Sequence, residues 1–95
     1  MKTESRYITR GIQAELPSWL VNLLWFMRDG MEVEKQDYLQ IFRLSRTDKG
    51  QRIEHEQEQP PYQKTLDVPC EDAVGAKVYI IDDGTHVTML LADEY

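Results

Sequence analysis

The stretch KVYIIDDGTHVTMLL, Lys77 to Leu91, holds two apolar runs joined by the four residues DDGT. Aspartate followed by glycine between apolar runs is typical of a hairpin turn, because glycine accepts a positive φ and aspartate binds the backbone that follows it. We therefore predict two antiparallel strands here, one on each side of a tight turn.

The same turn gathers Asp82, Asp83, Thr85 and His86, whose side chains are also those of acid-base and metal sites. Calcium-binding loops place their acids at alternate positions of a longer loop, which DDGTH does not do. The pattern favours a turn alone. A metal site would need further ligands from elsewhere in the chain.

Upstream of this hairpin, alternation of side chains predicts more strands. YLQIFRLS, residues 38–45, alternates and is apolar enough to be mostly buried on both sides. RTDKGQ, residues 46–51, has the Asp and Gly of a hairpin loop, so RIEHEQE, residues 52–58, should return antiparallel. The two prolines at 60–61 end that strand because they cannot donate to a ladder, and residues 62–68 form another.

Residues 17–29 have the spacing of a helix. Pro17 suits a first helical turn, and Asp29-Gly30 is a plausible stop. The apolar residues at helical spacing are Trp19, Leu20, Leu23, Leu24 and Met27. Large side chains should anchor so small a core, and the candidates are Trp19, Trp25, Phe26 and Phe42.

The apolar arc of this helix is wider than one sheet face needs, because Val21, Trp25 and Phe26 extend it. Core packing is the simpler interpretation. The alternative is that Val21 with Trp25 or Phe26 remains exposed as a protein interface, since exposed apolar patches usually mark contact surfaces.

Ahead of the helix, RYITRGI, residues 6–12, alternates and predicts a short strand. Together these segments predict an α+β fold, in which one main amphipathic helix packs on a mainly antiparallel sheet of about five or six short strands. The length of 95 residues fits one small domain, residues 1–95.

Composition narrows the function classes. The net charge is −6, with +1 in residues 1–50 and −7 in residues 51–95, and an acidic half repels phosphate backbones. We expect no nucleic-acid partner. The apolar run at 19–27 is too short to span a bilayer, and residues 1–11 lack the pattern of a signal peptide, so we expect a cytoplasmic protein without membrane contact.

Two further segments carry polar candidates. Glu54, Glu56 and Glu58 alternate along one strand and predict a solvated acidic face, with His55 pointing to the opposite side. Cys70 is the single cysteine, so no intrachain disulfide forms, and its acidic neighbours disfavour a reactive thiolate.

Several separated words also resemble one known family. They are RYITRGIQAELP at 6–17, DYLQIF at 37–42, EQPPY at 58–62 and VYIIDDGTHVTMLLADEY at 78–95. Together they resemble domain of unknown function 960, small proteins of Gram-positive bacteria and their phages. The resemblance implies a free-standing bacterial or prophage domain, and it implies no activity, ligand or catalytic residue.

Two classes of function follow from the residues. The first is a non-catalytic, acidic protein-interaction domain with an accessory or regulatory role, which includes an acidic DNA-mimic inhibitor as a special case. It would bind an unidentified protein or a second copy of itself and use no cofactor, and its candidate interface residues are Val21, Trp25, Phe26, Glu54, Glu56 and Glu58. The alternative is a small enzyme or metal-dependent protein that uses Asp82, Asp83, His55 or His86.

Overall fold

The computed structural model describes residues 4–95 and places six strands in one sheet, in the order β1-β6-β5-β2-β3-β4. The strands are β1 (Arg6–Ile8), β2 (Leu39–Arg46), β3 (Gly50–Gln57), β4 (Tyr62–Pro69), β5 (Ala76–Asp82) and β6 (Val87–Leu91). All neighbouring strands are antiparallel except β1 and β6, which are parallel. The stretch that was predicted not to be a signal peptide, residues 1–11, includes residues 1–3, which lie outside the described residues.

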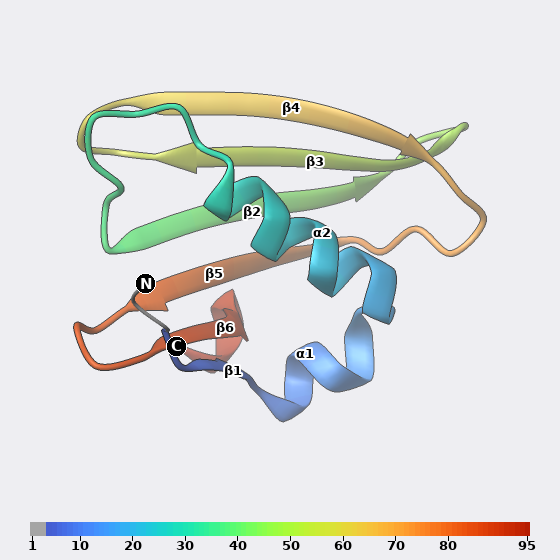
Figure 1. The fold of residues 1–95 in the computed structure, drawn as a ribbon. Coiled ribbons are helices and arrows are strands. Elements are labelled where there is room, and N and C mark those ends of the chain that lie inside the picture. Colours follow the sequence, from blue (N-terminus) through green and yellow to red (C-terminus); the bar gives the residue numbers. More distant parts are fainter. Residues whose placement is uncertain (1–3) are drawn as a thin grey trace.

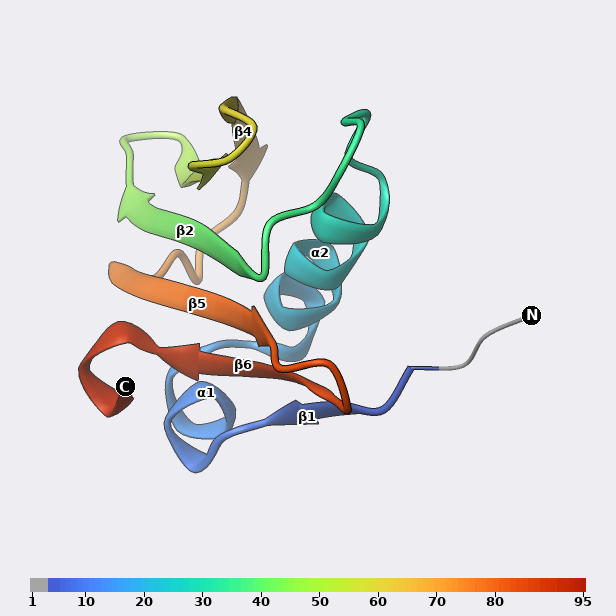
Figure 2. The same ribbon diagram turned by 90° about the vertical axis from the view of Figure 1, so that its left-hand side faces the viewer.

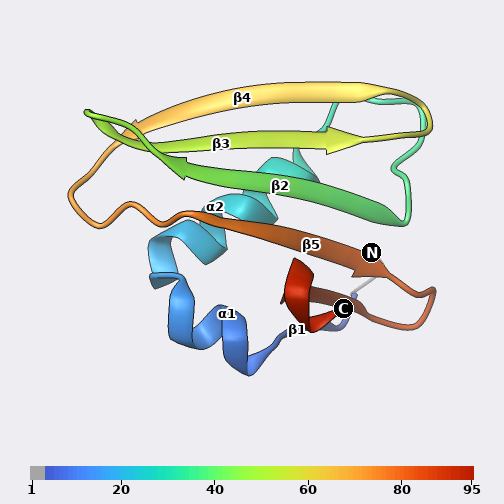
Figure 3. The same ribbon diagram turned by 180° about the vertical axis from the view of Figure 1, so that it is seen from behind.

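The helices are α1 (Arg10–Glu15), α2 (Ser18–Asp29) and the short 3₁₀ helix η1 (Ala92–Glu94). Figure 1 shows α2 lying obliquely across one face of the sheet, and Figure 2 shows the two layers from the side. From behind, Figure 3 shows η1 on the opposite face, next to β5 and β6, and no other described helix lies there. The predicted α+β architecture of one main helix on a mainly antiparallel sheet is confirmed.

The segment ahead of α2 corrects one prediction. The strand predicted over residues 6–12 ends at Ile8, and α1 begins at Arg10. Thr9 starts this helix, since its side-chain oxygen accepts a hydrogen bond from the backbone N–H of Ile12 at 3.3 Å. Ile12, predicted as a strand residue, is instead the buried side chain of α1.

α2 has the predicted bounds, with Pro17 at its N-cap and Gly30 at its C-cap. Gly30 has φ −92°, so this helix ends without the left-handed conformation that usually favours glycine there. Gly50 does need to be glycine, because its φ is +149° and a Cβ would run into the backbone of Val68 and Cys70.

The core lies between α2 and the sheet. Leu20, Leu24 and Met27 of α2 point down onto it, and Phe42 lies at its centre without exposed surface. The buried apolar side chains that the sheet contributes are Phe42, Leu44, Ile53, Val78, Ile80, Val87 and Met89.

Three of the four predicted anchors differ from expectation. Trp19 and Trp25 are half-buried and pack against the edge of the core, whereas Phe26 is 73% exposed. α2 buries one side against the sheet, and Phe26 lies on the outer side together with Ser18 and Asn22, which are also exposed. Phe26 therefore faces solvent, and its assignment to the core is wrong.

The predicted strands and turns of the sheet are confirmed. β2 and β3 pair with Phe42 opposite His55, and Glu54 and Glu56 lie on the face away from α2. The expectation that residues 38–45 are mostly buried on both sides is wrong, because on the face away from α2 only Ile41 is buried and Arg43 is exposed. β4 forms one edge of the sheet, with prolines before it and at its last residue.

The two ends of the described chain meet. β1 pairs with β6, and the Glu94 carboxylate accepts hydrogen bonds from the Thr9 hydroxyl at 2.7 Å, Gly11 N–H at 3.3 Å and Leu91 N–H at 2.8 Å. A Cβ on Gly11 would lie 2.6 Å from this carboxylate, so glycine makes room for it. These hydrogen bonds, first that of Thr9, lower the pKa of Glu94.

Replacing Glu94 by glutamine should loosen α1 and the β1–β6 pair, because glutamine loses the charge that strengthens these hydrogen bonds. We expect a lower melting temperature and faster hydrogen exchange at Gly11 and Ile12. Asp93→Asn, which removes the neighbouring charge, is the control and should leave both nearly unchanged. Equal exchange in the two variants would contradict the clamping role of Glu94.

Candidate functional site

The turn between β5 and β6 is held by its own side chains. Asp83 Oδ1 accepts the backbone N–H groups of Thr85 and His86 and the Thr85 hydroxyl, each at 2.9 Å. Asp82 accepts Gly84 N–H at 2.9 Å, and Gly84 has φ +94°. These are the contacts of a side-chain-capped hairpin turn, as predicted from DDGT.

The electrostatics of this turn are also internal. Hydrogen bonds from His86 and Thr85 hold the pKa of Asp83 at about 2. His86 Nε2 lies 3.1 Å from Asp83 Oδ2, its Nδ1 lies 3.0 Å from the Thr85 hydroxyl, and its ring contacts Tyr7 edge-on. Asp83, Thr85 and His86 thus bind one another, which leaves the turn little capacity for a reacting group.

His55 lies in a different part of the molecule. It is fully buried in β3, and two strands, β2 and β5, separate β3 from β6. Burial, with a smaller contribution from Lys64, lowers the pKa of His55 to about 4, so its imidazole is neutral near pH 7. Its ring stacks on Phe42 with centroids 4.2 Å apart. The structure therefore does not bring His55 to Asp82, Asp83 and His86.

One buried glutamine, Gln40, contacts His55 and is itself bound to buried Gln57, and neither glutamine was predicted as part of a site. Gln40 Oε1 lies 2.8 Å from His55 Nε2, and Gln40 Nε2 donates to Gln57 Oε1 at 2.7 Å. Because Gln40 donates to Gln57, its oxygen must accept from His55, which places the imidazole proton on Nε2. Nδ1 is buried and has no hydrogen-bond partner among the described residues. The period of two could have identified these positions, since Gln40 shares a face with Phe42.

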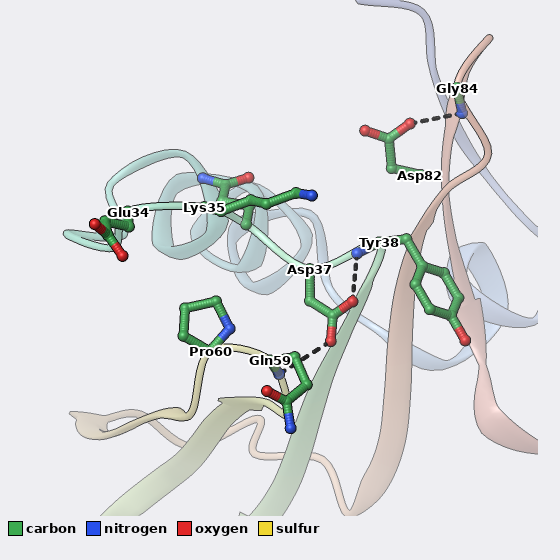
Figure 4. A pocket seen from close by; sticks show the side chains of 9 residues that line it. Glu34, Lys35, Asp37, Tyr38, Gln59, Pro60, Asp82 and Gly84 are labelled. Atoms are coloured by element: carbon green, nitrogen blue, oxygen red, sulfur yellow. Dashed lines mark hydrogen bonds between the residues drawn. The ribbon is translucent and has the colours of Figure 1, made fainter.

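The largest cavity, about 750 Å³, lies beside the chain that leads from α2 to β2 (Figure 4). Its lining residues are Glu34, Lys35, Gln36, Asp37, Tyr38, Gln59, Pro60, Asp82 and Gly84. Asp37 accepts the N–H groups of Tyr38 at 2.8 Å and Gln59 at 3.3 Å, and Figure 4 shows the Tyr38 ring turned away from Asp37.

This cavity includes Asp82 but neither Asp83 nor His86. Its carboxylates at Asp37 and Asp82 accept backbone N–H groups, so they serve the loops they belong to. Within residues 4–95, no group of three or more His, Cys, Asp or Glu side chains could hold a metal ion. Cys70 is half-buried and unpaired.

The candidate interface on α2 is divided by the structure. Val21 and Trp25 are half-buried against the core, and the Arg6 guanidinium lies 4.8 Å above the Trp25 ring. Phe26 is the exposed member of the three. Nearer the start of α2, a groove of about 540 Å³ lies between α2, α1 and β1, and its lining residues are Ile8, Gln13, Leu16, Ser18, Val21 and Asn22.

The predicted acidic face lies on the opposite side of the sheet from α2. Glu54 and Glu56 are half-buried there, and Glu58 follows the end of β3. Glu56 forms an ion pair with Arg43, and Arg52 binds Asp67 at 2.8 Å. Basic side chains are therefore interspersed on this face, which the spacing of the glutamates alone did not indicate.

Within the described part of the chain, no helix is long and apolar enough to cross a bilayer. Among the described residues, the large hydrophobic side chains exposed to solvent are Tyr7, Ile8, Phe26, Tyr38 and Tyr95.

The chain matches a protein family and a solved structure. No curated protein matches the chain. A solved structure, described as the crystal structure of a protein of unknown function from Enterococcus faecalis, superposes with a TM-score of 0.84. It is 26% identical, and the match covers 97% of this chain and 91% of that one. The family described as Staphylococcal protein of unknown function (DUF960) matches residues 5–94, and by this match over almost the whole chain, the protein belongs to the DUF960 family.

Proposed function

We propose that this protein is a non-catalytic protein-binding domain with an accessory or regulatory role in a bacterium or its prophage. The observation that carries the proposal is the exposure of Phe26. Phe26 is 73% exposed on the outer side of α2, one helical turn beyond Asn22, which lines a groove. Large exposed apolar side chains of this kind usually mark contact surfaces.

The polar candidates support the same function by their contacts. Asp83, Thr85 and His86 bind one another, and His55 is enclosed beneath α2. Side chains used in catalysis must reach a substrate, whereas these complete a turn and a core. Exposed aromatic side chains, by contrast, supply much of the affinity of protein interfaces.

The acidic side chains have a different role in this proposal. Glu54, Glu56 and Glu58 lie away from α2, and the first two alternate with Arg43 and Arg52. We assign them to solubility and to the exclusion of nucleic acid, because the −7 charge of residues 51–95 repels phosphates. A single cysteine supports a reducing, cytoplasmic location.

Photo-crosslinking in the native host tests the proposal. Phe26 is replaced by the photoreactive analogue p-benzoylphenylalanine, which retains a phenyl ring at the contact position. Illumination should link the domain covalently to a protein, to be identified by mass spectrometry. The control carries the same analogue at Tyr38, which is 60% exposed but lies outside the α2 flank. Adducts at position 38 that equal or exceed those at position 26 would rule this surface out.

A further inference from the structure

The outer side of α2 has a stripe of three exposed residues, Ser18, Asn22 and Phe26. They are four residues apart, so they follow one side of the helix, and each step advances about 6 Å along its axis. Asn22 lies midway. Phe26 is the single large side chain of this stripe and is 73% exposed.

The groove beside α2 begins at the other end of the same stripe. On α2 it is lined by Ser18, Val21 and Asn22, and its other lining residues are Ile8 of β1, Gln13 of α1 and Leu16, so polar and apolar residues contribute in equal number. Its volume of about 540 Å³ exceeds the space that a phenyl group needs. A protruding ring and an open groove thus lie on one helix, on either side of Asn22.

This spacing makes the surface complementary to itself. A two-fold axis through Asn22 would place two α2 helices antiparallel, with Phe26 of one copy facing Ser18 and the groove of the other. We propose that the domain forms a two-fold dimer in which Phe26 of each copy enters the groove beside α2 of the second copy. This inference rests on the proposed function and names the protein that is bound.

Charge favours a second copy over a basic partner at this surface. The stripe and all six lining residues of the groove are uncharged, in a chain whose net charge is −6. A basic partner gains nothing from a neutral patch and is attracted to acidic surface elsewhere. Two copies of an acidic chain can meet without opposing like charges at the centre of the contact only where the surface is neutral, as it is here.

The size of the contact sets its strength. α2 has 12 residues, so the two helices can contact over about 18 Å of length and about 12 Å of width. This footprint is about 200 Å² on each copy, and with the groove included the contact is still well below the lower limit of about 1,200 Å² for stable interfaces. We therefore expect a weak, reversible dimer that is dissociated at low micromolar and forms toward millimolar protein concentration.

Sedimentation over a dilution series from micromolar to millimolar protein measures this equilibrium. The wild-type mass should rise toward that of a dimer, and Phe26→Ser should weaken the Kd at least tenfold, because the inserted ring is lost. Tyr38→Ser, which removes an equally exposed aromatic side chain outside the stripe, should dimerise like the wild type. Salt should strengthen the dimer by screening two like net charges, whereas it would weaken binding to a basic partner.

Symmetric crosslinking tests the axis independently of affinity. In a Cys70→Ser background, Asn22→Cys should form an intermolecular disulfide on oxidation, because the two-fold axis brings position 22 next to its own copy. Ser18→Cys should crosslink much more slowly, since the axis places it opposite Phe26. Equal rates at the two positions would overturn the proposed arrangement, even if a dimer forms.

The outcomes separate the two proposals. A wild-type chain that remains monomeric at millimolar concentration overturns the dimer. If photo-crosslinking at position 26 then yields another host protein, the protein-binding function still holds. If neither a dimer nor a position-26 adduct forms, both proposals are wrong.

Discussion

Replacing Phe42 by alanine should lower the free energy of unfolding by about 3 to 5 kcal/mol, the usual cost of truncating a buried phenylalanine. Phe42 is fully buried in β2 beneath α2, and its ring stacks on His55. The substitution leaves a cavity between helix and sheet that neither layer can close without moving. Urea denaturation followed by the fluorescence of Trp19 and Trp25 measures the change. In so small a domain, this loss approaches the whole stability.

Phe26→Ala is the matched control for this experiment. The same side chain is removed, but Phe26 is 73% exposed, so the free energy of unfolding should change by about 0.5 kcal/mol or less. Both variants should be compared at low micromolar concentration, where the proposed dimer is dissociated. Similar losses for the two phenylalanines would show that the helix faces the sheet with a different side.

Lowering the pH from 7 to 4 should remove about 3 kcal/mol of stability through His55 alone. Burial lowers the pKa of His55 from 6.5 to about 4, so the unfolded chain takes up the proton first. The stabilisation is therefore complete above pH 6.5, and it is lost progressively as the pH falls from 6.5 to 4. The slope should be about 1.4 kcal/mol per pH unit at most, measured by urea unfolding at several pH values.

The two histidines offer a direct control. The His55→Gln variant should be less stable than the wild type at pH 7, because the stacking on Phe42 is lost. Its free energy of unfolding should change little between pH 6.5 and 5. His86→Asn should retain the wild-type slope. Carboxylates with lowered pKa, such as Asp83, add their own loss only at more acidic pH. A wild-type slope in His55→Gln would show that other groups cause the pH dependence.

Turns and helix ends were predictable because their causes are local. DDGT forms its turn through contacts among residues 82–86, and Pro17 and Gly30 delimit α2 from within the same stretch of chain. The period of two placed His55 and its flanking glutamates on opposite faces correctly. In each case, the interactions that decide the structure join residues close in sequence.

The errors concern contacts between distant segments. α1 begins at Arg10 because Thr9 caps it and Glu94, 85 residues away, binds Thr9, which no local pattern shows. Phe26 lies outside the core because the sheet covers the side of α2 that carries Leu20, Leu24 and Met27. The candidates at the β5–β6 turn and His55 were considered together because of their residue types. In the sheet, β2 and β5 lie between His55 on β3 and the strand β6 that follows this turn.

The contact between the first and last strands also bears on the synthesis of the chain. β1 and α1 are synthesised before the other elements of the described fold, whereas β6 and Glu94, which contact them, are synthesised after all the other strands. At about 5 to 20 residues per second, the early segment waits roughly 4 to 17 seconds for its partners. Until these partners are made, Ile12 of α1 cannot be buried. Chaperones and proteases can therefore reach this segment while the rest of the chain is being synthesised.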